Sequence, residues 1–151
     1  MPENETWDYA LSIPNDVRAV TVCRRTLRLI LTLHGLIGLA DMAELLAAEL
    51  VSNAVRHTTG PAALRVRRTR DGAVWIAAWD TDPAPPGPPR PLDQGQNRNL
   101  LQEDGRGLGL VTACADLWGW QPSARFGARG KYVWCQLGPG LPDNDPVSTS
   151  G

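Results

Sequence analysis

The sequence has few of the features that mark secreted, membrane or zinc-binding proteins. Its three cysteines, Cys23, Cys114 and Cys135, are odd in number and far apart, which excludes a disulfide framework and a zinc-ligand spacing. No apolar run reaches the roughly 18 residues that a membrane span needs, and the acidic N-terminus is unlike a signal peptide. We therefore expect a cytoplasmic protein with buried, reduced thiols and no membrane contact.

Neither sign of charge is in excess. The chain carries 15 basic and 16 acidic residues and a formal net charge of −1. No overall field draws it to nucleic acid, so no direct nucleic-acid binding is expected. A local run of arginines, Arg65, Arg67, Arg68 and Arg70, is interpreted as the solvated edge of a hairpin. The length of 151 residues and the 42% hydrophobic content are typical of one globular domain with a sizeable core.

Residues 41–57 form the stretch around which the rest of the chain is arranged. No glycine or proline interrupts it, and its apolar residues recur at helical spacing, which predicts a helix. Asp41 is the expected N-cap of this helix. Glu44, three residues later, is the expected partner of Asp41 in a capping box.

Glu49 and Asn53 lie one turn apart on the polar side of the expected helix. For one helix in isolation, a solvated face is the simplest interpretation of this pair. Asparagine favours caps and turns over helix interiors, however, and its side-chain oxygen is a ligand that Mg²⁺ accepts. The pair is therefore also a candidate site for a metal ion.

Changes in hydrophobic spacing divide the rest of the chain into strands and helices. The expected strands cover residues 7–13, 62–68, 74–79, 118–120 and 131–137, and the further expected helices cover residues 16–34 and 110–117. Asp71 and Gly72 form a hairpin signal between two of the strands. This order predicts an α+β fold, a two-layer sandwich whose mixed, mostly antiparallel sheet is covered on one face by helices.

Residues 81–104 differ in composition from the rest of the chain. Their prolines exclude a helix or a central strand, and a long loop inside a compact domain is usually functional or disordered. Glycines 105, 107 and 109 follow, just before a helical pattern, and suit a close approach of backbone N–H groups to phosphates. No P-loop lysine follows them, and no strand precedes them as in a Rossmann fold.

In combination these segments resemble the ATP site of the GHKL superfamily, which has the Bergerat ATP-binding fold. Residues 49–57 resemble its N box, residues 79–82 its first G box, residues 83–104 its ATP lid and residues 104–110 its second G box. The Glu-Leu-Val-x-Asn-Ala-x-x-His and Gly-Arg-Gly-Leu-Gly-Leu sequences, with Gly130-Lys131-x-Val133-Trp134 in the last strand, are most similar to the stand-alone anti-sigma-factor serine/threonine kinases. The resemblance implies one histidine-kinase-like ATPase domain over residues 7–138, between a disordered N-terminus (1–6) and a flexible tail (139–151).

The resemblance implies a role for each candidate residue. Asp80 would accept a hydrogen bond from the adenine amino group, Asn53 would hold Mg²⁺ through its side-chain oxygen, and Glu49 would be the general base on a serine or threonine hydroxyl. The residues implied to bind ATP and its Mg²⁺ are Asn53, His57, Asp80, Asp82, Gly105, Arg106, Gly107, Leu108 and Gly109. A surface histidine at a helix end is an equally simple interpretation of His57.

The first G box departs from the pattern of the superfamily, because Asp82 and Ala84 stand where glycines are usual. Two functions stay open. One is an ATP-dependent kinase, expected as a homodimer, that phosphorylates an anti-sigma-factor antagonist and sequesters a sigma factor. The other is a non-catalytic or weakly nucleotide-binding regulatory module of the same fold. Glu49 favours the kinase, because a pure binding module needs no carboxylate there, and the missing glycines favour the binding module. Arg18 and Arg25 are the expected partner contacts.

Overall fold

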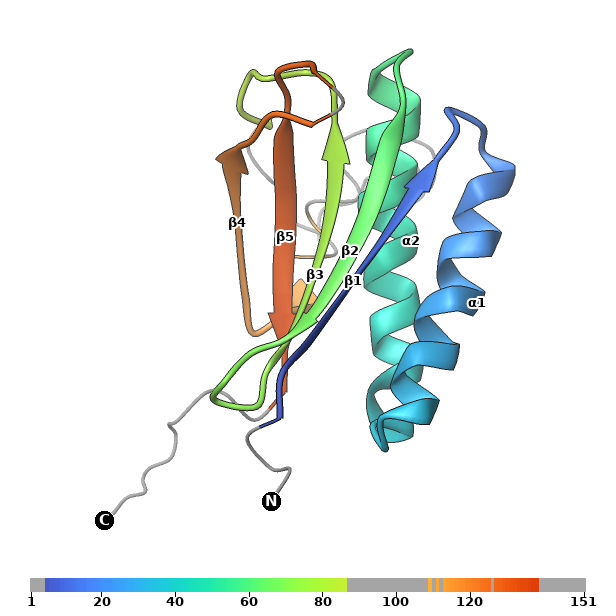
Figure 1. Ribbon diagram of the computed structural model, residues 1–151, viewed down its shortest axis with the longest axis vertical. Coiled ribbons are helices and arrows are strands. Elements are labelled where there is room, and N and C mark those ends of the chain that lie inside the picture. The colour runs from blue at the N-terminus through green and yellow to red at the C-terminus, as the bar shows by residue number, and fades with distance from the viewer. Residues whose placement is uncertain (1–4, 87–108, 110, 112, 126, 139–151) are drawn as a thin grey trace, which may run out of the picture.

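The computed structural model describes residues 5–86, 109, 111, 113–125 and 127–138. Its elements are β1 (Trp7–Ile13), α1 (Arg18–Leu33), the short 3-10 helix η2 (Ile37–Leu39), α2 (Ala40–His57), β2 (Ala62–Arg68), β3 (Val74–Asp80), β4 (Leu117–Pro122) and β5 (Lys131–Leu137). One twisted sheet forms the first layer, and α1 and α2 lie side by side against one of its faces (Figure 1). The predicted two-layer α+β fold is therefore confirmed.

The sheet has the strand order β1-β2-β3-β5-β4. All four strand pairings among the described residues are antiparallel, so the mixed sheet that we expected is antiparallel throughout this part of the chain. The hairpin predicted at Asp71 and Gly72 joins β2 to β3. Gly72 has a φ of 93°, which glycine adopts without steric cost. Because β3 and β5 are neighbours in the sheet, Asp80 lies directly opposite Lys131.

The helices differ from the prediction at their N-termini. Helix α2 follows η2 without a break, and the residue before it, Leu39, already has helical backbone angles. No side chain caps the helix, so the predicted capping box of Asp41 and Glu44 is wrong. Both carboxylates instead form ion pairs with Arg28 of α1. The two acidic residues therefore join the helices to each other, which the spacing within one helix does not reveal.

The main core lies between the helices and the inner face of the sheet. The apolar side of α2, including Leu46, Leu50 and Val51, is buried there. It packs in one cluster with inner-face residues such as Leu64 and Ile76. This burial is the dominant stabilising contribution to such a fold. It also holds α2 fixed against β3, the strand that ends in Asp80.

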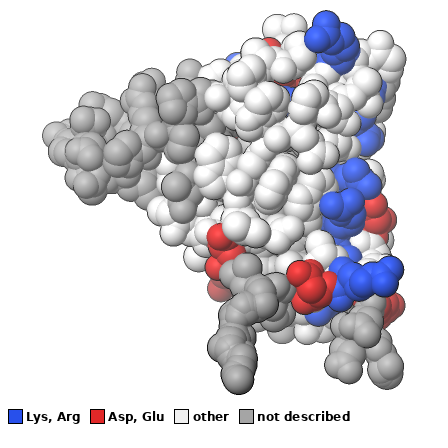
Figure 2. Space-filling view, turned by 90° about the vertical axis from the view of Figure 1, so that its left-hand side faces the viewer, with Lys and Arg blue, Asp and Glu red and all other residues white. Residues whose placement is uncertain are grey.

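The outer face of the sheet carries a second apolar cluster, which includes Trp75, Trp79 and Tyr132. Arg65 donates two hydrogen bonds to Asp8, at 3.0 and 2.7 Å, and these lower the pKa of that carboxyl. The guanidinium of Arg67 lies 4.3 Å from the centroid of the Trp75 ring. The interpretation of the arginine run as a solvated hairpin edge therefore holds for the exposed Arg70 but is wrong for Arg65 and Arg67. In Figure 2, basic side chains gather along the right-hand edge, and most of the described surface beside them is uncharged.

Several predictions concern the segment between β3 and β4. Val111, Ala113 and Cys114 are helical, as expected, and Gly109, which we expected just before the helix, is helical as well. Leu117, the expected last residue of the helix, belongs to β4. Some predictions lie outside the described residues. They concern residues 1–4, most of the expected lid, Gly105, Arg106, Gly107, Leu108 and the tail from 139. None of the helices in the described part is long and apolar enough to cross a membrane. Cys23 and Cys135 are buried as expected, and Cys114 is partly buried.

Candidate functional site

Helix α2 places Glu49 and Asn53 one turn apart, in the half of the helix that runs toward its C-terminus. Glu49 is only 8% exposed, and Asn53 is half-buried. The simplest interpretation of the pair, a solvated helix face, is therefore wrong for Glu49. Charged side chains are rarely this buried unless they are paired or functional. His57, a further turn along, is exposed.

Asp80 ends β3 and is 6% exposed. Its Oδ1 atom accepts a hydrogen bond from Lys131 Nζ at 3.0 Å and another from the backbone N–H of Asp82 at 2.9 Å. Lys131 Nζ also donates to the carbonyl oxygen of Asp82 at 2.9 Å. The Asp80 carboxylate is thus held both by its own turn and by the neighbouring strand.

Opposing effects act on the charge of Asp80. Burial raises its pKa above the ordinary value, and this is the largest effect. The hydrogen bonds from the Asp82 backbone and from Lys131 lower the pKa, and the charge of Asp82 raises it further. The ammonium group of Lys131 therefore favours the ionised form of Asp80, whereas burial disfavours it.

The sequence alone predicts no function for Lys131, which entered only as part of the Gly-Lys-x-Val-Trp sequence that supports the family resemblance. A signal was present, because Lys131 is the only lysine in a chain with fourteen arginines, and it begins a strand of apolar residues. What the sequence does not contain is the strand order. Only the pairing of β3 with β5 places this lysine opposite Asp80.

Two glycines let the backbone close around the end of β3. A Cβ atom at Gly60, just beyond α2, would lie 2.8 Å from Thr81 Cγ2. A Cβ atom at Gly130 would lie 2.1 Å from the carbonyl oxygen of Asp80. Asn15 donates hydrogen bonds to the carbonyl oxygens of Thr58 and Gly60, at 2.8 and 3.1 Å. These contacts bring the C-terminal end of α2 and the end of β3 together, so the elements that carry the two predicted motifs meet at the same end of the fold.

The remaining predicted residues have different surroundings. Asp82 is exposed, and its carboxylate accepts a hydrogen bond from the backbone N–H of Ala84 at 3.0 Å. Asp80 and Asp82 therefore form two successive turns in which each side chain bonds the backbone two residues on. Gly109 is buried at the first described helical position after the expected lid.

The donor groups suit Mg²⁺ that is shared with phosphates. Among the described residues, no three or more His, Cys, Asp or Glu side chains gather in a way that would hold a metal ion. Magnesium commonly takes only one or two protein ligands and completes its shell with waters and substrate phosphates. The half-buried amide oxygen of Asn53 fits that requirement, so the site is compatible with a metal that arrives with a nucleotide.

Comparisons with known proteins place this arrangement in a family. A model of the histidine kinase-like ATPase domain family matches residues 13–135, a range that includes Glu49, Asn53 and Asp80. A chain from the crystal structure of the SiaB–SiaC complex of Pseudomonas aeruginosa superposes with a TM-score of 0.58 and 14% identity. That match covers 85% of this chain and 88% of that chain, and it confirms the fold. No protein with a curated description matches the sequence significantly. On the strength of the family match, which spans most of its length, the chain belongs to the histidine kinase-like ATPase domain family.

Proposed function

We propose that the protein is a cytoplasmic serine/threonine kinase of the anti-sigma-factor type, which binds ATP at the site between α2 and β3. The observation that carries the proposal is the buried, lysine-paired carboxylate of Asp80 beside a helix that carries Glu49 and Asn53. Buried ionisable groups whose pKa is shifted by burial and by a charged partner are often found at functional sites. We propose that residues 7–138 form the catalytic domain, with the lid at about 83–104.

In the proposed mechanism each residue performs one task. Asp80 accepts the adenine amino hydrogen and so selects adenine over guanine. Asn53 holds Mg²⁺, which neutralises phosphate charge when it is bound. Glu49 removes the proton from the acceptor hydroxyl. The proposed task of the second G box is to enclose the phosphates with Gly105, Arg106, Gly107, Leu108 and Gly109. The proposed task of His57 and Asp82 is to line the rim of the site.

The proposed protein partners are a sigma factor and an anti-sigma-factor antagonist. Support comes from the fold shared with a chain of the SiaB–SiaC complex, which is an assembly of two proteins. The outermost turn of α1 offers Arg18, whose guanidinium pairs with Asp16 at 2.7 Å, and the exposed Arg25 lies further along that helix. These two arginines are retained as proposed partner contacts.

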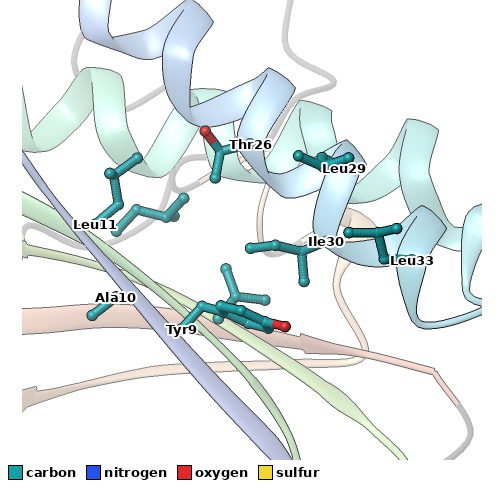
Figure 3. Close-up of a pocket in the computed structure, with 9 residues that line it drawn as sticks. Tyr9, Ala10, Leu11, Thr26, Leu29, Ile30 and Leu33 are labelled. Atoms are coloured by element: carbon teal, nitrogen blue, oxygen red, sulfur yellow. The ribbon is translucent and has the colours of Figure 1, made fainter.

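We propose a second copy of the chain as the occupant of an apolar groove between β1 and α1 (Figure 3). The groove has a volume of about 260 Å³, and Tyr9, Leu11, Leu29 and Leu33 are among its lining residues. Strand β1 is one edge of the sheet, and within the described part of the chain no strand pairs with its outer backbone groups. A twofold contact would pair β1 with β1 and cover both grooves at once, because the same surface serves both copies.

One observation favours the second candidate function, a regulatory module that binds nucleotide weakly or not at all. The turn after β3 carries Asp82 and Ala84 at the expected glycine positions, and hydrogen bonds already close it. A turn that is closed in this way leaves fewer backbone groups for a nucleotide.

Calorimetric titration distinguishes the two functions. MgATP is titrated into the wild type and into Asp80→Asn, with MgGTP as the matched control ligand. The kinase proposal expects ATP to bind, GTP to bind far more weakly, and the substitution to abolish the preference. A folded wild-type protein that binds neither nucleotide would exclude the kinase and leave the regulatory module.

A further inference from the structure

Lys131 is the one buried basic side chain in the described part of the chain, at 5% exposure. Its ammonium group lies at the centre of the site, between Asp80 and the turn that follows β3. Burying an ammonium group is costly unless its hydrogens are donated to good acceptors. The role proposed above for Asp80 leaves this lysine unexplained.

The two oxygens of Asp80 are held differently. Oδ1 has two short hydrogen bonds, from Lys131 Nζ at 3.0 Å and from the backbone of Asp82 at 2.9 Å. Among the described residues, the closest donor to Oδ2 is the same Lys131 Nζ at 3.4 Å, which is longer than the usual N–H···O range of about 2.7–3.2 Å. One oxygen is therefore saturated, and the other can still accept a short hydrogen bond.

We propose that Lys131 is a positioning residue for base recognition: it fixes Asp80 through Oδ1 and leaves Oδ2 to accept the adenine amino hydrogen. This inference rests on the proposed ATP-binding function. The ammonium group lies 3.0 Å from Asp80 Oδ1, 3.4 Å from Asp80 Oδ2 and 2.9 Å from the Asp82 carbonyl oxygen. Lys131 is thus engaged with the carboxylate and the turn that follows it, and in this proposal it acts through Asp80.

The positioning has a charge component as well as a geometric one. A carboxylate accepts a hydrogen bond from an amino group at either oxygen, whereas a protonated carboxyl carries its own hydrogen on one of them. Among the described residues, the charged neighbours of Asp80 are Lys131 on β5 and Asp82 in the turn. Helix α2, which packs against β3, carries Glu49, Arg56 and His57 in its C-terminal half. Of these groups, only Lys131 has a cationic atom within hydrogen-bond distance of Asp80.

The test compares wild type with two variants, Lys131→Met and Lys131→Gln. Both remove the charge, and Lys131→Gln keeps a hydrogen-bond donor, so it serves if the methionine variant does not fold. MgATP affinity is measured by calorimetry from pH 5 to pH 8, and the Asp80 carboxyl carbon is titrated by NMR without nucleotide. Both variants are expected to bind MgATP about tenfold more weakly, because a carboxylate that is no longer fixed offers the base a less well placed acceptor. The Asp80 titration midpoint is expected to move upward, because the neighbouring cation that favours the carboxylate is gone, and the loss of affinity at low pH is expected to begin at a correspondingly higher pH. Lys131→Arg, which keeps the cation, is expected to recover part of the affinity.

The outcomes separate this inference from the function on which it rests. If wild type binds no nucleotide, the proposed kinase function fails, whereas an unchanged Asp80 midpoint in the variants overturns the role of Lys131. If the variants bind MgATP as tightly as wild type, or more tightly, Lys131 does not position Asp80 and instead competes with the base. A weaker affinity whose pH profile stays that of wild type would mean that Lys131 contributes only to folding, and this also overturns the proposal.

Discussion

Gly130 passes so close to Asp80 that a Cβ atom at position 130 would lie 2.1 Å from the Asp80 carbonyl oxygen. The same atom would lie 2.6 Å from the ring of Trp79, the fully buried residue that precedes Asp80. Trp79 is itself fixed, because its indole N–H donates to the carbonyl oxygen of Ser123 at 2.8 Å. The loop before β5 and the end of β3 therefore share one rigid contact, and neither side can yield cheaply.

Replacing this glycine should disturb both stability and the site. We expect Gly130→Ala to lower the free energy of unfolding by about 1–3 kcal/mol, because added atoms in a packed region force backbone shifts. Urea denaturation measures the change. Gly38→Ala is the matched control, since a Cβ there meets no atom within 4 Å. A Gly130→Ala protein as stable as the control would show that the contact is looser than described.

Asn53→Ala tests the proposed metal position. Since the amide oxygen is the only group that the mechanism assigns to Mg²⁺, its loss should abolish the part of nucleotide affinity that depends on Mg²⁺ and leave the fold intact. The measurement is calorimetric titration of ATP with Mg²⁺ and with EDTA. Ser52→Ala, at the adjacent and similarly half-buried position, is the control. Unchanged Mg²⁺ dependence in Asn53→Ala would remove Asn53 from the metal site.

Glu49→Ala separates binding from chemistry. A general base contributes on the order of 10²–10⁴-fold to a rate, so phosphotransfer should fall by that factor while ATP affinity stays close to that of wild type. Single-turnover transfer of labelled γ-phosphate to the antagonist protein gives the rate, and calorimetry gives the affinity. Full transfer activity in this variant would place the base elsewhere, and a parallel loss of affinity would indicate a structural role for this buried carboxylate.

Most of the fold follows from local patterns. The strand at residues 7–13 has the predicted bounds, and helix α2 ends at the predicted residue 57, because alternation and helical spacing record which face of each element is buried. The Asp71-Gly72 hairpin likewise depends only on adjacent residues. Helical spacing and the chemistry of asparagine single out Asn53, the resemblance assigns a role to Asp80, and the fold brings the elements that carry them together.

What the sequence could not supply depends on contacts between distant segments. Asp41 has the residue type of a helix cap, but Arg28 of the other helix pairs with its carboxylate. Glu49 has the pattern of a surface residue, but the surrounding fold buries it. Lys131 acquires its partner only through a pairing between strands 51 residues apart. In each case the deciding partner lies on another element, so spacing within one element carries no information about it.

The proposed twofold contact predicts the effect of charge in the groove. Leu29 and Leu33 are 57% and 72% exposed, so Leu29→Glu and Leu33→Glu should leave the isolated chain folded. In a dimer formed through the groove, each would bury an unpaired carboxylate, so the double variant should be a monomer. Light scattering coupled to size-exclusion chromatography measures the mass. Leu45→Glu, at an exposed leucine of α2 outside the groove, is the control and should keep the wild-type mass. A dimeric double variant would exclude this face as the contact.

The buried thiols predict how stability changes in alkaline solution. Burial raises the pKa of Cys23 to about 11 and of Cys135 to about 12, from 9.0 in the unfolded chain. Above pH 9 the unfolded state therefore binds fewer protons than the folded state. The free energy of unfolding falls as pH rises from 9, and the fall ends once the pH exceeds the pKa values of the two thiols in the folded state. The slope is about 1.4 kcal/mol per pH unit for each thiol.

Urea denaturation between pH 8 and pH 11 should show a shallower decline for Cys23→Ala/Cys135→Ala than for wild type. Val51→Ala, which removes buried apolar volume without a titrating group, should keep the wild-type slope. Equal slopes in all three proteins would mean that the thiols ionise as readily in the folded state as in the unfolded one.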